Sequence, residues 1–148
     1  MMSAEERSLD GLVIAVDFDG TCVTHEYPKV GRYIGAEPVL LDLVKAGARL
    51  VLFTMRDGKE LDDAVSWFGK HSIPLFGVNR HPTQDSWTSS PKAWASLYID
   101  DAALGTRVKR GLTGERPYVD WQWVRRILLP DSVSGKSSGK PSENGEED

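Results

Sequence analysis

The chain has 148 residues, a length that suits one domain with a hydrophobic core of ordinary size. Hydrophobic residues make up 40% of it and charged residues 27%, which is typical of globular proteins. The net charge of −4 provides no basic field for nucleic acid, and no apolar run approaches the length of a membrane span, so neither partner is expected.

The two ends of the sequence differ from the middle. Residues 1–10 are polar and acidic, do not resemble a signal peptide, and are expected to form an irregular lead-in. Residues 130–148 are rich in Ser, Gly, Lys and Glu, which predicts a disordered polar tail. The folded domain is therefore expected at 11–129. The single cysteine, Cys22, allows no internal disulfide, which favours the cytoplasm.

Between these ends, strand-like and helix-like segments alternate along the chain. Residues 12–18 are apolar up to Asp17, which predicts a strand buried on both faces. Residues 37–46 and 59–70 have the spacing of amphipathic helices. The remaining expected elements, in chain order, are a flap loop at 22–36, a strand at 49–54, a strand at 75–78, a polar loop at 79–90, a helical turn at 91–95, strands at 96–99 and 117–119, and a helix at 120–129. This alternation predicts an α/β fold with a three-layer, Rossmann-like parallel sheet and helices on both faces.

Three of the expected strands end in polar residues. They are Asp17 and Asp19 at the end of the first strand, Thr54 at the end of the second, and Asp100 and Asp101 at the end of the fourth. In parallel sheets, chemistry gathers at the carboxyl ends of the strands. A cluster of carboxylates repels itself unless a cation neutralises it, and oxygen ligands suit Mg²⁺. Lys92 would add a compact positive charge for a phosphoryl oxygen.

The residue order resembles the four motifs of the haloacid dehalogenase-like (HAD) superfamily. The motif residues are DFDGT at 17–21, Thr54, Lys92 and IDD at 99–101. The resemblance spans roughly 12–129 and is closest to small, capless hydrolases, in which a histidine and a YP…G segment follow the first motif. The intervals between the motifs leave no room for a separate cap domain.

This resemblance implies a Mg²⁺-dependent phosphatase that acts through an aspartyl-phosphate. Asp17 would be the nucleophile and Asp19 the general acid/base, while Thr54 and Lys92 would bind the phosphoryl group of a phosphorylated substrate of unknown size. The implied Mg²⁺ ligands are Asp17, the backbone carbonyl of Asp19, and Asp100, with Asp101 in direct or indirect support. Two alternatives stay open: transfer of the phosphoryl group to an acceptor other than water, and a catalytically idle binding module that keeps the fold.

For several other side chains the sequence leaves two roles open. Arg56 would contact a substrate phosphate, or would form a surface ion pair with Asp57 or Glu60. His25, in the flap, would contact substrate or be a bystander. The alternatives for Lys92 and Asp101 are a solvated surface lysine and a helix N-cap. Among the structural expectations are a buried Cys22, core positions for Trp67 and Trp94, and different faces for Trp121 and Trp123.

Overall fold

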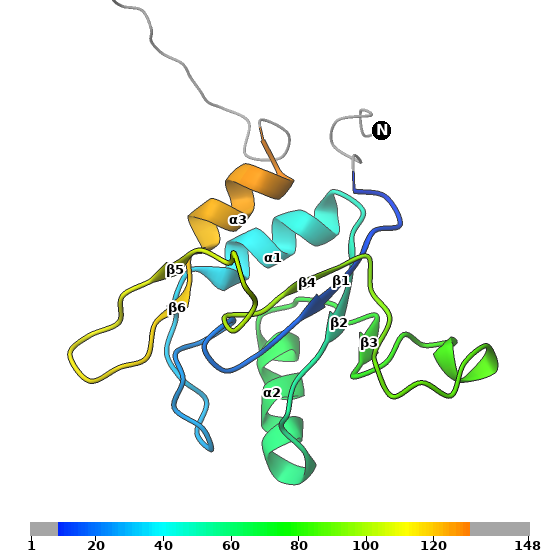
Figure 1. Cartoon of the computed structure of the whole chain (residues 1–148), viewed down its shortest axis with the longest axis horizontal. Coiled ribbons are helices and arrows are strands. Elements are labelled where there is room, and N and C mark those ends of the chain that lie inside the picture. Colours follow the sequence, from blue (N-terminus) through cyan, green and yellow to red (C-terminus); the bar gives the residue numbers. More distant parts are fainter. Residues whose placement is uncertain (1–8, 131–148) are drawn as a thin grey trace, which may run out of the picture.

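The computed structural model describes residues 9–130, so the tail expected at 130–148, apart from Pro130, and most of the N-terminal lead-in lie outside the described residues. A four-stranded parallel sheet in the order β3-β2-β1-β4 forms the centre of the protein (Figure 1). The strands of this sheet are β1 (Val13–Val16), β2 (Arg49–Leu52), β3 (Gly77–Val78) and β4 (Leu97–Ile99). The helices are α1 (Ala36–Lys45), α2 (Gly58–Lys70) and α3 (Trp121–Leu128). Within this part of the chain, no helix is both long and apolar enough to cross a membrane.

The register of the sheet aligns the carboxyl ends of three strands. Val16, the last residue of β1, lies beside Leu52 of β2 and Ile99 of β4. The ladder continues for one more residue, because the Asp17 amide donates to the Ile99 carbonyl at 3.0 Å. The residues that follow these strands therefore meet at one edge of the sheet, as an α/β fold with parallel strands requires.

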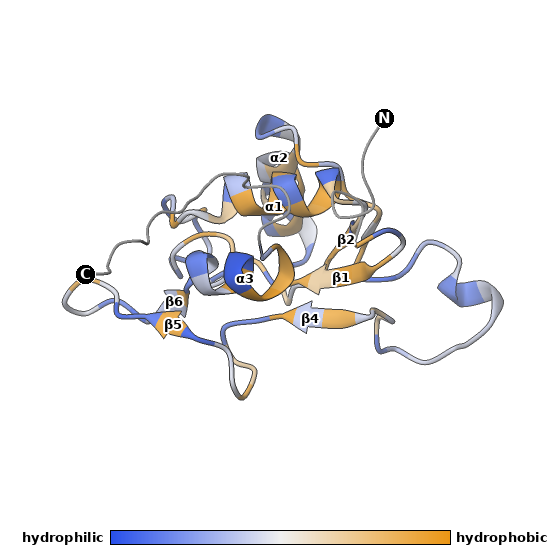
Figure 2. Ribbon diagram, turned by 90° about the horizontal axis from the view of Figure 1, so that it is seen from above, coloured by the Kyte–Doolittle hydropathy of each residue, from blue (hydrophilic) through white to orange (hydrophobic). Residues whose placement is uncertain are grey.

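One apolar core holds the sheet and the helices together. Ile14, Val16 and Phe18 alternate along the first strand and its extension, and they share this core with buried residues of α1, α2 and α3. The amphipathic character of the helices is visible in Figure 2, where hydrophilic and hydrophobic residues alternate along α1 and α3. The helices thus bury their apolar sides in a single core.

The opposite face of the sheet corrects the expectation of helices on both faces. Val13, Ala15 and Val51 are buried but stand outside the shared core. The long connection from β3 to β4 crosses the sheet from one edge to the other, and it buries Ala93, whose carbonyl accepts a 2.7 Å bond from the Tyr98 hydroxyl. Irregular chain therefore covers this face, so the three-layer expectation is wrong, whereas the parallel α/β sheet is confirmed.

The same connection also differs locally from the expectation. Residues 91–95 form no helical turn, and a 3-10 turn stands instead at Gln84–Ser86. The buried Gln84 amide donates to the Lys92 carbonyl at 2.6 Å and accepts from the Trp94 amide at 2.9 Å. One buried side chain thus supplies the hydrogen-bond partners that a helix would have provided.

The expected strand at 117–119 is present but does not extend the main sheet. It forms as β6 (Tyr118–Val119) and pairs antiparallel with β5 (Val108–Lys109), a strand that the sequence did not predict. Among the described strands, β4 is therefore an edge strand. The Gly20 carbonyl accepts a 3.1 Å bond from the Val119 amide, so this β5–β6 ribbon is joined to the turn after β1.

The expectations for Cys22, for Trp67 and for the pair Trp121 and Trp123 are confirmed, and the one for Trp94 is wrong. Cys22 and Trp67 are buried, and Trp121 donates its indole N–H to the Thr21 carbonyl at 2.7 Å from a buried position, while Trp123 is half-buried. Trp94 is 45% exposed and packs its ring against His81 outside the core.

Candidate active site

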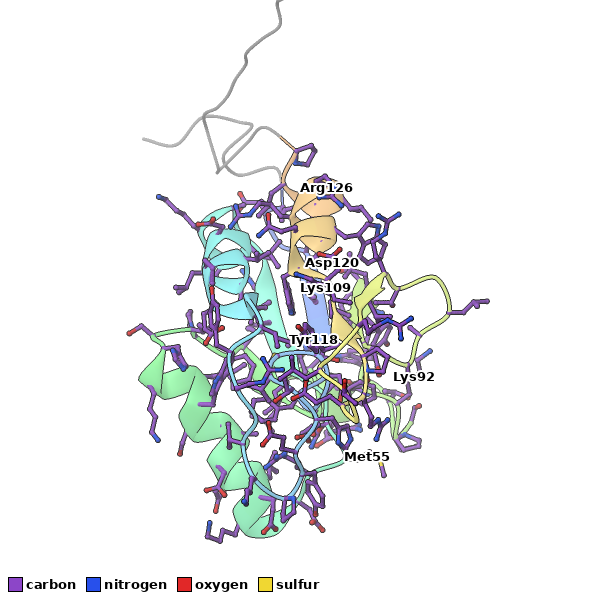
Figure 3. All side chains as sticks on the ribbon, turned by 90° about the vertical axis from the view of Figure 1, so that its left-hand side faces the viewer. Met55, Lys92, Lys109, Tyr118, Asp120 and Arg126 are labelled. Atoms are coloured by element: carbon purple, nitrogen blue, oxygen red, sulfur yellow. The ribbon has the colours of Figure 1, made fainter. Side chains whose placement is uncertain are left out.

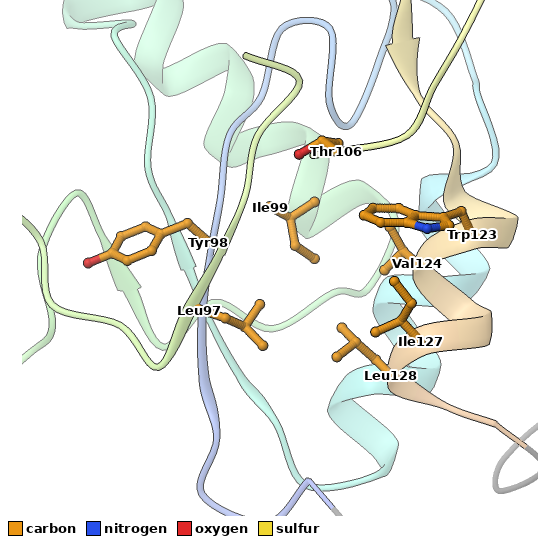
Figure 4. A pocket seen from close by; sticks show the side chains of 8 residues that line it. All are labelled: Leu97, Tyr98, Ile99, Thr106, Trp123, Val124, Ile127 and Leu128. Carbon is orange, nitrogen blue, oxygen red and sulfur yellow. The ribbon is translucent and has the colours of Figure 1, made fainter. Parts of the chain in front are cut away.

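Two cavities differ in their chemistry. The first lies between β4 and α3 and is almost wholly apolar, with Leu97, Ile99, Val124 and Leu128 in its wall (Figure 4). The second, an open cavity of about 480 Å³, lies at the carboxyl ends of β1, β2 and β4. The following residues line it: Asp17, Asp19, His25, Tyr27, Thr54, Met55, Arg56, Asp100, Asp101, Ala102 and Arg116. The predicted site residues therefore gather in the second cavity, apart from Lys92.

A triad of carboxylates lies at the base of this cavity. Asp17, Asp100 and Asp101 each offer a carboxylate oxygen, and these oxygens lie within 4.8 Å of one another. Asp17 follows β1, and the other two follow β4, so the parallel pairing of these strands brings the acids together. Three carboxylate oxygens are a donor set that suits a hard divalent cation such as Mg²⁺. The Asp19 carboxylate does not belong to the triad.

Thr21 and Gly20 shape the turn that holds the triad. The Thr21 hydroxyl donates to Asp17 Oδ2 at 2.9 Å and accepts from the Asp101 amide at 3.1 Å. Gly20 has a φ of +80°, and a Cβ there would stand 2.5 Å from Asp101 Oδ2. Glycine is therefore needed at this position for two reasons: the backbone is left-handed, and the Asp101 carboxylate approaches closely.

Burial and the charges of neighbouring carboxylates oppose the ionisation of the triad. Burial, followed by the charge of Asp100, raises the pKa of Asp17 from the ordinary 3.8 to about 7, although the Thr21 hydrogen bond opposes the rise. Burial also raises the pKa of Asp101. The metal-free chain thus holds these acids close together only at an electrostatic cost, which a bound cation would remove.

Asp19 lies beside the triad in an ion pair with Arg56. The Arg56 Nε and Nη2 donate to the two Asp19 oxygens at 2.8 Å each. The Arg56 side chain is 1% exposed and that of Asp19 13% exposed. Neither Asp57 nor the Glu60 carboxylate is the partner, so the expectation of a local surface pair is wrong.

The same guanidinium also joins the flap to α2. It donates to the carbonyls of Pro28, Lys29 and Glu60 at 3.3, 2.6 and 3.1 Å respectively. It lies 5.0 Å from the ring centroid of Phe18 and 5.2 Å from that of Tyr27. Arg56 is thus fully engaged by protein groups, which leaves it little capacity to contact a substrate phosphate.

Thr54 follows β2, which ends at Leu52, and it lines the cavity as predicted. Its amide donates to the Asn79 side-chain oxygen at 2.8 Å, and its hydroxyl oxygen accepts from the Arg56 amide at 3.1 Å. The hydroxyl hydrogen is free to point into the cavity. Asn79 follows β3 and has a φ of +58°.

The structure places Lys92 outside the cavity wall. Its Nζ lies 5.4 Å from the ring centroid of Tyr98, the residue of β4 that precedes Ile99 and Asp100. Lys92 is exposed. In the described part of the chain, its flexible side chain is held only by this cation–π contact. Its role at the site stays a prediction.

Arg116 and Met55 are among the cavity residues that the sequence analysis did not predict. Arg116, in the loop between β5 and β6, places its Nη1 3.0 Å from His25 Nε2. Met55 is 97% exposed beside Thr54. Neither residue belongs to a motif, and the contact between Arg116 and His25 spans 91 positions of sequence, so sequence reasoning had no signal with which to find it.

Comparisons with known proteins give one structural relative. No family model matches the chain, and no curated protein matches it. A solved structure of a conserved protein from Bacteroides thetaiotaomicron is 31% identical to the chain, with a TM-score of 0.67. The match covers 80% of this chain and 90% of that one.

Proposed function

We propose that this chain, which belongs to the same family as the conserved protein from Bacteroides thetaiotaomicron, is a Mg²⁺-dependent phosphatase that acts through an aspartyl-phosphate. We further propose that the family is a capless branch of the HAD-like superfamily, because the motif residues occur in the order of that superfamily. The observation that carries the proposal is the triad of Asp17, Asp100 and Asp101, which lies in an open cavity beside a fourth carboxylate, Asp19.

The four carboxylates would divide the chemical work. Asp17 follows β1 and lines the cavity, so an oxygen of its carboxylate would attack phosphorus. Asp19 would protonate the leaving oxygen and later take a proton from the water that cleaves the acyl phosphate. Asp100 and Asp101 would hold Mg²⁺ together with Asp17, and the bound ion would offset the negative charge of the transferring group.

The neighbours of the carboxylates support these roles. Each Asp19 oxygen accepts one bond from Arg56 and keeps a second lone pair, so Asp19 can still take up a proton in a fixed orientation. Thr54 has a hydroxyl hydrogen to donate to a phosphoryl oxygen. Lys92 would have to move from the Tyr98 ring to reach the same group.

A screen of phosphoesters tests the proposed function. We expect hydrolysis of p-nitrophenyl phosphate and of some members of a broad panel in the presence of Mg²⁺, and none in excess EDTA. Full activity in EDTA would contradict the assignment of the triad. Phosphorylated acceptors in the product mixture would indicate transfer in place of hydrolysis. If no member of the panel is turned over, trapping of beryllofluoride at Asp17 separates an enzyme with an untested substrate from an idle binding module.

We expect Mg²⁺ to raise the melting temperature, and to raise it more at pH 8 than at pH 5. Burial raises the pKa of Asp17 to about 7, so between pH 3.8 and about pH 7 the folded chain keeps a proton that the unfolded chain releases. Metal-free stability therefore falls as the pH rises through this window and levels off above it. Mg²⁺ at 100 times its Kd adds about 2.7 kcal/mol, which corresponds to a rise of roughly 5–10 °C.

Thermal unfolding with Mg²⁺ or EDTA at the two pH values measures this effect. Asp100→Ala should abolish most of the Mg²⁺ response, whereas Asp62→Asn, on the exposed side of α2, should retain it. A melting temperature that is insensitive to Mg²⁺ at both pH values would show that the triad does not bind the ion.

A further inference from the structure

One cation of the cavity wall has no acidic partner in the part of the chain that the structure describes. Arg116 is exposed and lines the same cavity as Asp17, and no ion pair joins its guanidinium to any carboxylate within residues 9–130. The other arginine of the wall, Arg56, is buried and paired with Asp19. Arg32, which contacts the same loop, is paired with Glu115 at 2.6 Å. Arg116 is therefore the unpaired cationic group of this wall in the described part of the chain.

His25 holds Arg116 without neutralising it. The Arg116 Nη1 donates to the His25 Nε2 at 3.0 Å, which fixes the imidazole as an acceptor at this nitrogen. A guanidinium has five N–H donors, so most of them stay free for a ligand. A histidine acceptor thus orients the guanidinium, whereas a carboxylate in its place would cancel the charge.

Arg116 also acts on the triad through its charge. Burial raises the pKa of Asp101, and the charge of Arg116 opposes that rise. The guanidinium is therefore within electrostatic reach of the carboxylates at the base of the cavity. Because Asp101 is a candidate metal ligand, its charge would be offset by a bound cation, and the charge of Arg116 would remain for another anion.

The position of Arg116 relates to a particular part of the substrate. The phosphoryl group must reach Asp17 at the base of the cavity, so the rest of the substrate has to lie along the remaining wall. Besides Arg116, that wall is formed by His25, Tyr27 and Met55. A neutral leaving group would leave the guanidinium without a partner there, whereas a carboxylate or a second phosphate would accept two parallel bonds from it.

We infer that Arg116, oriented by His25, binds a second anionic group of the substrate, so that the phosphatase acts on phosphoesters whose leaving group carries a carboxylate or a second phosphate. The inference rests on the proposed function and adds a substrate class to it. Arg116 and His25 determine which substrates bind, whereas the triad and Asp19 carry out the proposed reaction.

Matched pairs of phosphoesters test the inference. Phosphoglycolate compared with 2-hydroxyethyl phosphate isolates a carboxylate, and propane-1,3-diol bisphosphate compared with 3-hydroxypropyl phosphate isolates a second phosphate. We expect the wild type to have the higher kcat/KM for the anionic member of at least one pair, and the pair that shows the preference identifies the anion. Arg116→Gln should reduce that preference at least tenfold, and Arg116→Lys should restore part of it because a point charge keeps attraction without the planar fork.

The control is Arg126→Gln, which removes an exposed arginine from α3. Figure 3 shows Arg126 at the opposite end of the molecule from Met55, which marks the cavity, so both pair preferences should stay at the wild-type value. Calorimetric titration of the same four compounds into the inactive Asp17→Asn variant in the presence of Mg²⁺ gives a readout that does not depend on turnover. Adding Arg116→Gln to that variant should weaken binding of the preferred anion at least tenfold.

The outcomes separate the two proposals. Hydrolysis of p-nitrophenyl phosphate with no preference in either pair, or with a preference that Arg116→Gln leaves intact, would overturn the inference and leave the proposed function standing. Failure to hydrolyse any compound and to trap beryllofluoride at Asp17, together with Arg116-dependent binding of the anionic members, would overturn the proposed function and keep the anion site. Binding that is equal for all four compounds would overturn the inference even without turnover.

Discussion

Asp17→Asn is expected to lower kcat/KM for p-nitrophenyl phosphate by at least about 10³-fold, which corresponds to about 4 kcal/mol of barrier. The substitution keeps the shape of the side chain and its place beside Thr21, but it replaces the attacking oxygen anion with a neutral amide. Asp19, the other carboxylate that follows β1, lies outside the triad of Asp17, Asp100 and Asp101, so it is not expected to replace the nucleophile. Steady-state kinetics with saturating Mg²⁺ measure the loss.

The same variant should not be less stable than the wild type. At pH 8 the ionised Asp17 repels Asp100, and an asparagine removes that repulsion, so the metal-free melting temperature should stay equal or rise. Asp62→Asn is the matched control for the chemical change, since its carboxylate is exposed on α2, and it should keep wild-type kinetics. Turnover of Asp17→Asn within about tenfold of the wild type would exclude the covalent mechanism.

Arg56→Ala is expected to have the largest effect on stability, a loss of roughly 3–5 kcal/mol in the free energy of unfolding. The change leaves the Asp19 carboxylate without a cation in a nearly buried position. It also leaves the carbonyls of Pro28, Lys29 and Glu60 without their donor, so the flap loses its attachment to α2. Urea denaturation followed by circular dichroism measures the loss.

Arg56→Lys separates charge from geometry. A lysine keeps the positive charge but cannot make two parallel bonds to Asp19 and reach the carbonyls as well, so it should recover only part of the lost stability. Because Asp19 would lose its fixed orientation, kcat should also fall in this variant. Arg32→Ala breaks an exposed ion pair with Glu115 and should cost about 1 kcal/mol or less. An Arg56→Ala variant as stable as Arg32→Ala would contradict the structural role of Arg56.

The structure confirms the predictions that depended only on neighbouring residues in the sequence. The apolar run before Asp17 forms β1, the helices at 36–45, 58–70 and 121–128 lie within one or two residues of the expected ranges, and Thr54 and the two acids after β4 stand at strand ends. Each of these predictions depended on periodicity or on a short motif, and both are properties of neighbouring residues. The gathering of Asp17, Asp100 and Asp101 followed from one further rule, that parallel strands place their carboxyl ends at the same edge.

The sequence failed where a side chain had several possible partners at different distances along the chain. For Arg56, the nearby acids at 57 and 60 were the visible candidates, whereas the structure pairs it with Asp19, 37 positions earlier, because the turn after β1 and the loop after β2 meet at the sheet edge. The sequence predicts Trp94 on a helix face and therefore in the core, whereas it lies exposed beside His81 because the buried Gln84 fixes its backbone on an irregular loop.

By itself the sequence determined the parallel α/β sheet, the carboxylates at its carboxyl edge and the candidate chemistry of Asp17 and Asp19. Only the tertiary structure decided that irregular chain covers one face of the sheet, that β6 pairs with β5 outside the main sheet, and that Arg116 meets His25 in the cavity wall. The physical reason is that strands, helices and turns follow from the spacing of apolar and turn residues over a few positions. Ion pairs and cavity walls depend instead on which distant segments the packed core brings together, and a single sequence carries no local signal of that choice.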